Sequence, residues 1–181
     1  MKGIVFTLLN ELVEKQFGLA MWDAVLMDSG ESGIYTAAAS YPDQSILNLV
    51  MSLSARSGLP PDDLIRAFGT YMVSGFAEQY PDFFPPGISA KELLMSVQGI
   101  IHVEVKKLFP DAILPQFEYE DTSPTTLTMK YRSPRSLCVL AEGLIDGTGT
   151  FFGEKISREH SQCVKRGDRF CQFDLTFGGR T

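Results

Sequence analysis

The chain has 181 residues, of which 44% are hydrophobic and 21% are charged, a composition typical of one globular domain with a sizeable core. Its net charge of −6 argues against nucleic-acid binding, because phosphate recognition needs a dense basic surface. No run of about 18 apolar residues occurs, and Asn10 and Glu11 interrupt the apolar N-terminus too early for a signal peptide, so we expect a cytoplasmic protein without a membrane span.

Apolar residues recur at helical spacing through the first half of the chain. One helix begins at Pro60–Pro61, with two acidic residues in its first turn. Ser89 and Glu92 form the S-x-x-E pattern of a capping box at the start of another helix, which Pro110 ends. The sequence therefore predicts helices over residues 2–17, about 21–27, 42–58, 61–80 and 90–109.

The pattern changes after Pro110, where shorter apolar runs alternate with turn residues. The predicted elements are strands at 113–120 and 125–131, a helix from 136 to about 146 that ends at Gly147, and a final hairpin of strands 155–164 and 169–177. Helices followed by an antiparallel sheet that carries one helix make an α+β fold.

His102 is one of two histidines and lies inside the predicted helix 90–109. At about 100° per residue it is placed on the shoulder of the apolar stripe. Gly99, one turn earlier, leaves space beside the imidazole that a flat macrocycle would need. A histidine at such a position is more often a satisfied core residue than a ligand, and this helix alone leaves both interpretations open.

Tyr131, Ser133 and Arg135 alternate along a predicted strand, so their side chains are expected on one face. A phenol, a hydroxyl and a guanidinium together suit a pair of carboxylates, because arginine can bind a carboxylate bidentately. The alternative is an ordinary exposed strand end.

The three cysteines and His160 form a third candidate site. Three cysteines in such a chain indicate thiols or metal ligands and not a disulfide framework. Cys163 and Cys171 are each four residues from Gly167, so in a symmetric hairpin they face each other at a separation that suits a shared metal or a disulfide. Cys138 and His160 would complete a Cys₃His set, which needs a bend or bulge between His160 and Cys163. Two opposed core thiols are the alternative.

Together these residues resemble the H-NOX family, the haem nitric oxide/oxygen-binding domains related to the sensor domain of soluble guanylate cyclase. The most specific signature is Tyr131-x-Ser133-x-Arg135, which matches the family's Y-x-S-x-R motif. The opening residues 1–5 look like the family's start, and Pro115 takes the place of a proline that presses against the porphyrin.

The resemblance covers essentially the whole chain and implies its architecture. It implies one haem-binding sensor domain over residues 1–181, with lobes of roughly 1–60 and 61–181. A helical N-terminal lobe is followed by an antiparallel sheet with helices, and haem b is held between the lobes.

The resemblance also implies roles for the candidate residues. His102 would be the proximal ligand of the haem iron, because neutral imidazole is a standard iron ligand. The residues of the Y-x-S-x-R motif would hold the two haem propionates. Several bacterial members bind zinc near the C-terminus, which supports a structural or redox-responsive zinc site formed by Cys138, His160, Cys163 and Cys171.

The positions that line the distal side of the haem by resemblance are Val5, Leu9, Met72, Leu140 and Leu144. Oxygen-binding members have a tyrosine where this chain has Leu140. Bound O₂ is polar and is retained by a hydroxyl donor, whereas NO binds ferrous iron strongly without one. An aliphatic pocket is therefore expected to select NO and to tolerate CO.

The expected function is a haem-based nitric oxide sensor and not an enzyme. By resemblance, NO binds ferrous haem, the bond to His102 weakens or breaks, and the helix that carries this histidine is released while the porphyrin relaxes away from Pro115. The chain ends at Thr181, so we expect the free-standing bacterial form, whose partner in this family is a histidine kinase or a cyclic-di-GMP enzyme.

Two other functions stay open. A haem peroxidase or oxygenase normally needs a distal acid–base residue, and His160 is expected in the cysteine group instead. The final hairpin, residues 163–171, also resembles small-molecule-binding domains of the 4-vinyl-reductase type, which would make the protein a non-haem binding module.

Overall fold

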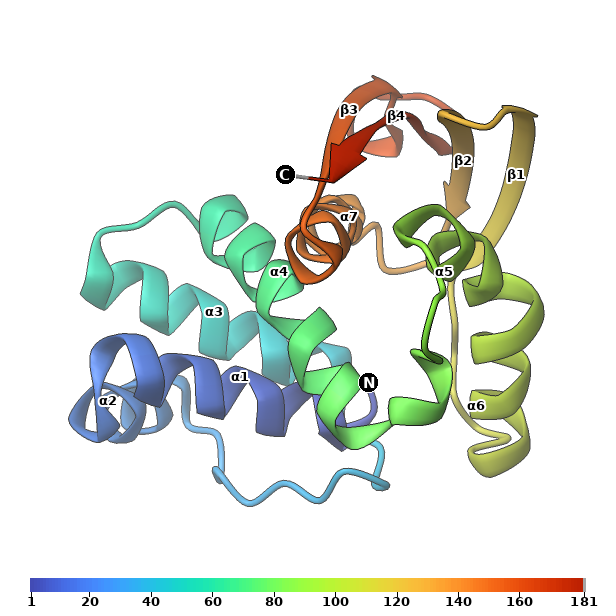
Figure 1. Cartoon of the computed structure of the whole chain (residues 1–181). Helices are drawn as coiled ribbons and strands as arrows, with labels where there is room; N and C mark the ends of the chain where they lie inside the picture. The colour runs from blue at the N-terminus through green and yellow to red at the C-terminus, as the bar shows by residue number, and fades with distance from the viewer. Residues whose placement is uncertain (181) are drawn as a thin grey trace.

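The computed structural model describes residues 1–180 and has an α+β fold, as the sequence predicts (Figure 1). The helices are α1 (Gly3–Phe17), α2 (Leu19–Ser29), α3 (Asp43–Ser57), α4 (Pro61–Gln79), α5 (Ala90–Ser96), α6 (His102–Leu108) and α7 (Cys138–Phe152). The strands are β1 (Gln116–Ser123), β2 (Thr126–Arg132), β3 (Glu154–Gln162) and β4 (Cys171–Arg180). Short 3₁₀ turns cover Pro81–Phe83 and Val164–Arg166.

The starts of α4 and α5 follow from their sequences. Pro61 occupies the first turn of α4 together with Asp62 and Asp63, where a proline needs no N–H partner and acidic side chains face the positive end of the helix dipole. The capping box predicted for α5 is confirmed, because the Ser89 side chain accepts from the backbone N–H of Glu92 while the Glu92 carboxylate accepts from the backbone N–H of Ser89.

The four strands form one antiparallel sheet in the order β1-β2-β4-β3. The two hairpins predicted from the sequence therefore meet along β2 and β4. β1 begins at Gln116 and not at residue 113, directly after Pro115, which has no N–H to give to a strand ladder.

Helix α7 runs to Phe152, although the sequence predicted its end at Gly147. Gly143 and Gly147 lie on the side of α7 that contacts α4. A Cβ atom at Gly143 would lie 2.1 Å from the carbonyl oxygen of Arg66, and one at Gly147 would lie 2.5 Å from that of Thr70. These glycines therefore allow two helix backbones to touch and do not end the helix.

The buried side chains form two hydrophobic clusters. The first joins the four helices α1, α2, α3 and α4, and the second joins α5, α7 and the sheet. The first cluster includes Leu64, Phe68 and Met72, so it extends through α4 beyond the lobe boundary expected near residue 60. In Figure 1, α7 lies between the sheet and the helices of the first cluster. No helix within residues 1–180 is both long enough and apolar enough to cross a membrane.

Candidate functional site

A cavity of about 610 Å³ lies where the two clusters meet, within the usual size range of ligand pockets. Its wall is mainly aliphatic and aromatic, and its polar groups include the imidazole of His102 on α6 and the side chains of Ser133 and Arg135 in the loop after β2. The predicted site residues that line it are Val5, Met72, His102, Pro115, Tyr131, Ser133, Arg135, Leu140 and Leu144. Leu9 is the exception, because it is buried in the first cluster and does not line the cavity.

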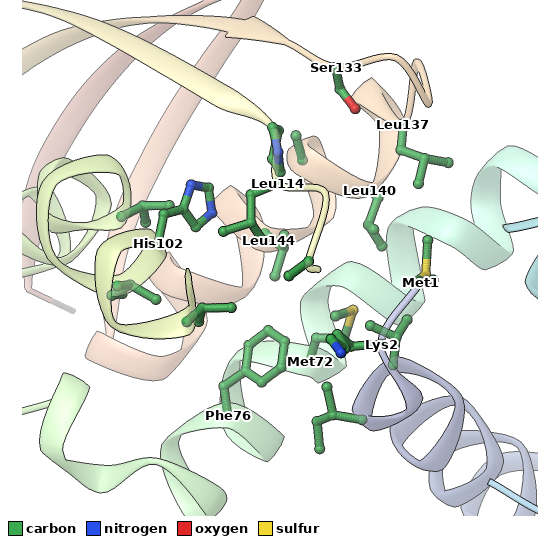
Figure 2. Close-up of a pocket in the computed structure, with 18 of the residues that line it drawn as sticks. Met1, Lys2, Met72, Phe76, His102, Leu114, Ser133, Leu137, Leu140 and Leu144 are labelled. Carbon is green, nitrogen blue, oxygen red and sulfur yellow. The ribbon is translucent and has the colours of Figure 1, made fainter. Parts of the chain in front are cut away.

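His102 begins α6 and its ring points into the cavity, toward Leu114 and Leu144 in the view of Figure 2. Its Nδ1 atom is buried and has no hydrogen-bond partner among the described residues. Burial lowers the pKa of His102, and the nearby carbonyl of Pro115 only partly opposes this effect. The imidazole is therefore neutral at physiological pH, which is the form that binds a metal.

A π-helical turn at Val97–Ile101 precedes His102, so the predicted helix 90–109 is not continuous. The backbone N–H of His102 donates to the carbonyl of Val97, five residues back. This wider turn rotates the preceding residues, and Gly99 is exposed and outside the cavity wall. The prediction that Gly99 leaves space beside the imidazole is therefore wrong, because it assumed α-helical periodicity.

Strand β1 holds the π turn in place. The Tyr119 hydroxyl donates to the carbonyl of Leu94 (2.8 Å), and the Gln98 side chain accepts from the backbone N–H of Phe117 (2.9 Å). Burial raises the pKa of Tyr119, so its hydroxyl remains a donor. Sequence reasoning missed Gln98 and Tyr119, because a partner on a distant strand leaves no local pattern.

Tyr131, Ser133 and Arg135 all line the cavity but do not share a strand. β2 ends at Arg132, so only Tyr131 belongs to it, and Ser133 and Arg135 lie in the following loop. The Ser133 hydroxyl accepts from the backbone N–H of Arg135 (3.2 Å). The strand alternation expected for the trio is therefore wrong, although the loop brings all three to the cavity.

Arg135 is held by Asp43, the first residue of α3. Nε of Arg135 donates to Asp43 Oδ2 (2.7 Å), and Nη1 donates to the carbonyl of Ile113. The N-terminal ammonium of Met1 lies 2.9 Å from the other carboxylate oxygen of Asp43. Although burial opposes it, these two cations lower the pKa of Asp43.

Lys2 and Asp111, which both line the cavity, make a second link. Nζ of Lys2 lies 2.9 Å and 3.0 Å from the two carboxylate oxygens of Asp111, which also accepts from the hydroxyl of Ser40 (2.6 Å). Hydrogen bonds from Lys2 and Ser40 lower the pKa of Asp111 to about 2. This contact joins the start of α1 to the loop that follows α6.

The predicted distal residues come from three helices, Val5 from α1, Met72 from α4, and Leu140 and Leu144 from α7. Figure 2 shows Met72 and Leu140 across the cavity from His102. None of these four side chains carries a hydroxyl or an N–H group. This part of the wall therefore offers a bound gas no hydrogen-bond donor.

A second group of candidate ligands lies on the side of α7 that faces away from the cavity. It consists of Cys138, His160, Cys163 and Cys171. One imidazole nitrogen and the three sulfur atoms lie within 4.8 Å of one another. The sulfur of Cys163 is 3.7 Å from that of Cys138 and 4.0 Å from that of Cys171. A tetrahedral site with Zn–S distances of about 2.3 Å places its sulfurs roughly 3.8 Å apart, so this arrangement fits zinc.

The hairpin geometry of the cysteines differs in part from the prediction. The bulge expected between His160 and Cys163 is confirmed, because the register of β3 with β4 shifts between His160 and Gln162. Cys163 lies just beyond β3, while Cys171 starts β4 and pairs with Tyr131 of β2. The direct cross-strand pairing of Cys163 with Cys171 is therefore wrong, since the 3₁₀ turn makes the connection asymmetric.

Two of the three cysteines, Cys138 and Cys171, are protonated without a metal. Burial raises the pKa of Cys138 to about 12, and burial also raises the pKa of Cys171. The three cysteines form no disulfide. A metal that binds here must therefore displace thiol protons.

The sequence matches the model of the Haem-NO-binding family over residues 2–160. The structure is similar to an H-NOX protein from S. oneidensis in the Fe(II)NO state, with 29% identity, a TM-score of 0.92, and coverage of 99% of this chain and 100% of that one. It is also similar to the Fe(II) unliganded H-NOX protein from K. algicida, with 32% identity, a TM-score of 0.85, and coverage of 99% and 97%.

An NMR structure of an H-NOX domain from Shewanella oneidensis in the Fe(II)CO state matches with 29% identity, a TM-score of 0.91, and coverage of 99% of both chains. No curated protein sequence matches significantly. The family model spans most of the chain, and the K. algicida protein exceeds 30% identity over nearly its whole length. The chain therefore belongs to the haem-NO-binding, or H-NOX, family.

Proposed function

We propose that this protein is a haem-based nitric oxide sensor that regulates a separate signalling protein and carries a zinc site. The observation that carries this proposal is the neutral His102 imidazole, directed into an apolar cavity of about 610 Å³ in a chain of the H-NOX family. When bound, haem b supplies a ferrous iron that binds diatomic gases.

The chain's own residues would hold the haem from two sides. His102 would supply a nitrogen ligand to the haem iron from α6. Arg135, Tyr131 and Ser133 lie at the cavity wall, where they are suited to bind propionates. Arg135 already pairs with Asp43, so its guanidinium is fixed near the cavity before any ligand arrives.

Selectivity for NO follows from the distal wall. Leu140, Leu144 and Met72 offer no hydrogen bond to bound O₂, so an oxygen complex gains no stabilisation there. NO and CO do not need that hydrogen bond. The similar H-NOX proteins from S. oneidensis form NO and CO complexes, which supports gas binding here.

We infer that the signal travels through α6. His102 is the first residue of this helix, and the loop after it reaches α1 through the Lys2–Asp111 ion pair. Weakening of the bond between the haem iron and His102 would shift α6 relative to the first cluster. A docked partner would then bind to a changed surface. The partner expected from the family is a histidine kinase or a cyclic-di-GMP enzyme.

The second histidine argues against a haem enzyme. His160 does not line the cavity and instead hydrogen-bonds Glu142 beside the cysteines. It is therefore not available as the distal acid–base group of a peroxidase.

The test is the absorption spectrum of haem-loaded protein with and without NO. We expect a Soret band that shifts with NO, and we expect His102→Gly to lose haem and to regain it with added imidazole. The absence of a Soret band after loading would favour a non-haem binding module. A wild-type band in His102→Gly without imidazole would show that His102 is not the axial ligand.

A further inference from the structure

Glu142 is a carboxylate buried inside the protein, on the face of α7 that turns toward the cysteine site. Its side chain is 7% exposed, which is rare for glutamate unless it is paired. Cys138 lies four residues earlier on the same helix, so the two side chains share one face of α7. This position brings a buried charge beside a candidate metal ligand.

Each carboxylate oxygen of Glu142 has a separate partner. Oε1 lies 2.6 Å from Nδ1 of His160 on β3. Oε2 accepts from Nη2 (2.6 Å) and Nε (3.1 Å) of Arg66 on α4, and it lies 3.4 Å from Nη1 of Arg158. Two guanidinium groups thus compensate the buried charge, and the bond to His160 is left to the other oxygen.

This geometry selects one tautomer of His160. An ionised carboxylate only accepts hydrogen bonds, so the proton of the neutral ring must sit on Nδ1. Nε2 then carries the free lone pair. It is buried without a hydrogen-bond partner among the described residues, and it is the ring nitrogen left to complete the group with Cys138, Cys163 and Cys171.

We propose that Glu142 is the positioning residue of the metal site: it fixes His160 with Nε2 toward the cysteine sulfurs and, through Arg66, ties the site to α4. The proposal rests on the Cys₃His zinc site of the proposed function. Carboxylates that orient a metal-binding histidine in this way typically contribute 10- to 100-fold to metal affinity, which sets the size of the expected effect at roughly those values.

The first test is the zinc affinity of the full chain, measured by competition with a chromogenic zinc chelator. Glu142→Gln keeps the size of the side chain, but its amide can also donate to Nδ1 and stabilise the other tautomer. We expect its zinc affinity to fall roughly 10- to 100-fold. Asp146→Asn is the matched control, because Asp146 also pairs with Arg158 from α7 but does not contact His160. Its zinc affinity should change by no more than about fivefold.

A second variant separates positioning from a general loss of structure. His160→Cys converts the site to four cysteines, which bind zinc without an imidazole. In this background Glu142→Gln should leave zinc affinity unchanged. An equal loss in both backgrounds would show that Glu142 acts on the fold and not on His160, and would overturn the proposal.

A third measurement needs no variant. The ¹⁵N chemical shifts of His160 in reduced, metal-free protein report which ring nitrogen carries the proton, and we expect Nδ1. A neutral ring that carries its proton on Nε2 and not on Nδ1 would overturn the proposal even if Glu142→Gln does not fold. If wild-type protein binds no zinc, the metal site and the role of Glu142 are both wrong. If it binds zinc and Glu142→Gln binds it equally well, only the role of Glu142 is wrong.

Discussion

The close contact between α4 and α7 predicts that a single added methyl group lowers the free energy of unfolding substantially. In Gly143→Ala the new Cβ would lie 2.1 Å from the carbonyl oxygen of Arg66 and 2.9 Å from Cα of Gly69, both of them backbone atoms. An ordinary carbon–oxygen contact needs about 3.3 Å, so the two helices must separate by roughly 1 Å. Overpacking of this kind costs about 1–3 kcal/mol of unfolding free energy.

For a chain of this size that cost corresponds to a fall in Tm of roughly 2–12 °C. Gly99→Ala is the matched control, because its Cβ would meet no atom within 4 Å. Replacing an exposed helical glycine by alanine is expected to stabilise by about 0.5–1 kcal/mol or to have no effect. Urea unfolding of both variants measures the difference.

The same change should reach the gas pocket, because α4 carries Met72 and α7 carries Leu140. We expect the CO stretching band of the ferrous–CO protein to shift in Gly143→Ala and to stay in place in Gly99→Ala. A Gly143→Ala protein whose unfolding free energy is within about 0.5 kcal/mol of wild type would refute the reasoning.

Arg135→Ala should weaken haem retention by about 1.5–3 kcal/mol through the loss of a charged hydrogen bond, measured as transfer of haem to apomyoglobin. Unchanged retention in both Arg135→Ala and Tyr131→Phe would contradict the propionate clamp. Ferrous protein should bind NO and CO and form no persistent oxy spectrum in air, whereas Leu140→Tyr should introduce an oxy spectrum if its hydroxyl reaches the ligand. Reduced protein purified without added metal should contain about one zinc per chain. Because burial raises the pKa of Cys138 and Cys171, zinc must displace their protons, and chelator competition should show affinity falling as pH falls; pH-independent affinity would contradict thiolate ligation.

Local patterns predicted the features that local forces decide. The capping box at Ser89 and the acidic start of α4 depend on residues a few positions apart, so the sequence alone indicates them. The bulge in β3 was predictable as well, because His160 and Cys163 differ by an odd number and an undistorted strand would separate them.

Contacts between distant residues were not predictable. Asp43 and Arg135 are 92 positions apart, and nothing near either residue indicates the other. The π turn before His102 is supported by Gln98 and Tyr119 through β1, whereas the local sequence is compatible with a continuous α-helix. The sequence pattern around Gly147 is typical of a helix end, but in the structure this glycine allows the backbone of α4 to lie against α7.

Helix α7 explains how two sites fit into one small chain. Leu140 and Leu144 are four residues apart and face the gas cavity, whereas Cys138 and Glu142 are four residues apart and face the cysteines. An offset of two residues is a rotation of about 200° on an α-helix, so the two pairs lie on nearly opposite sides. Gly143 and Gly147 let α7 lie directly against α4, and α4 in turn supplies Met72 to the cavity wall and Arg66 to the buried Glu142.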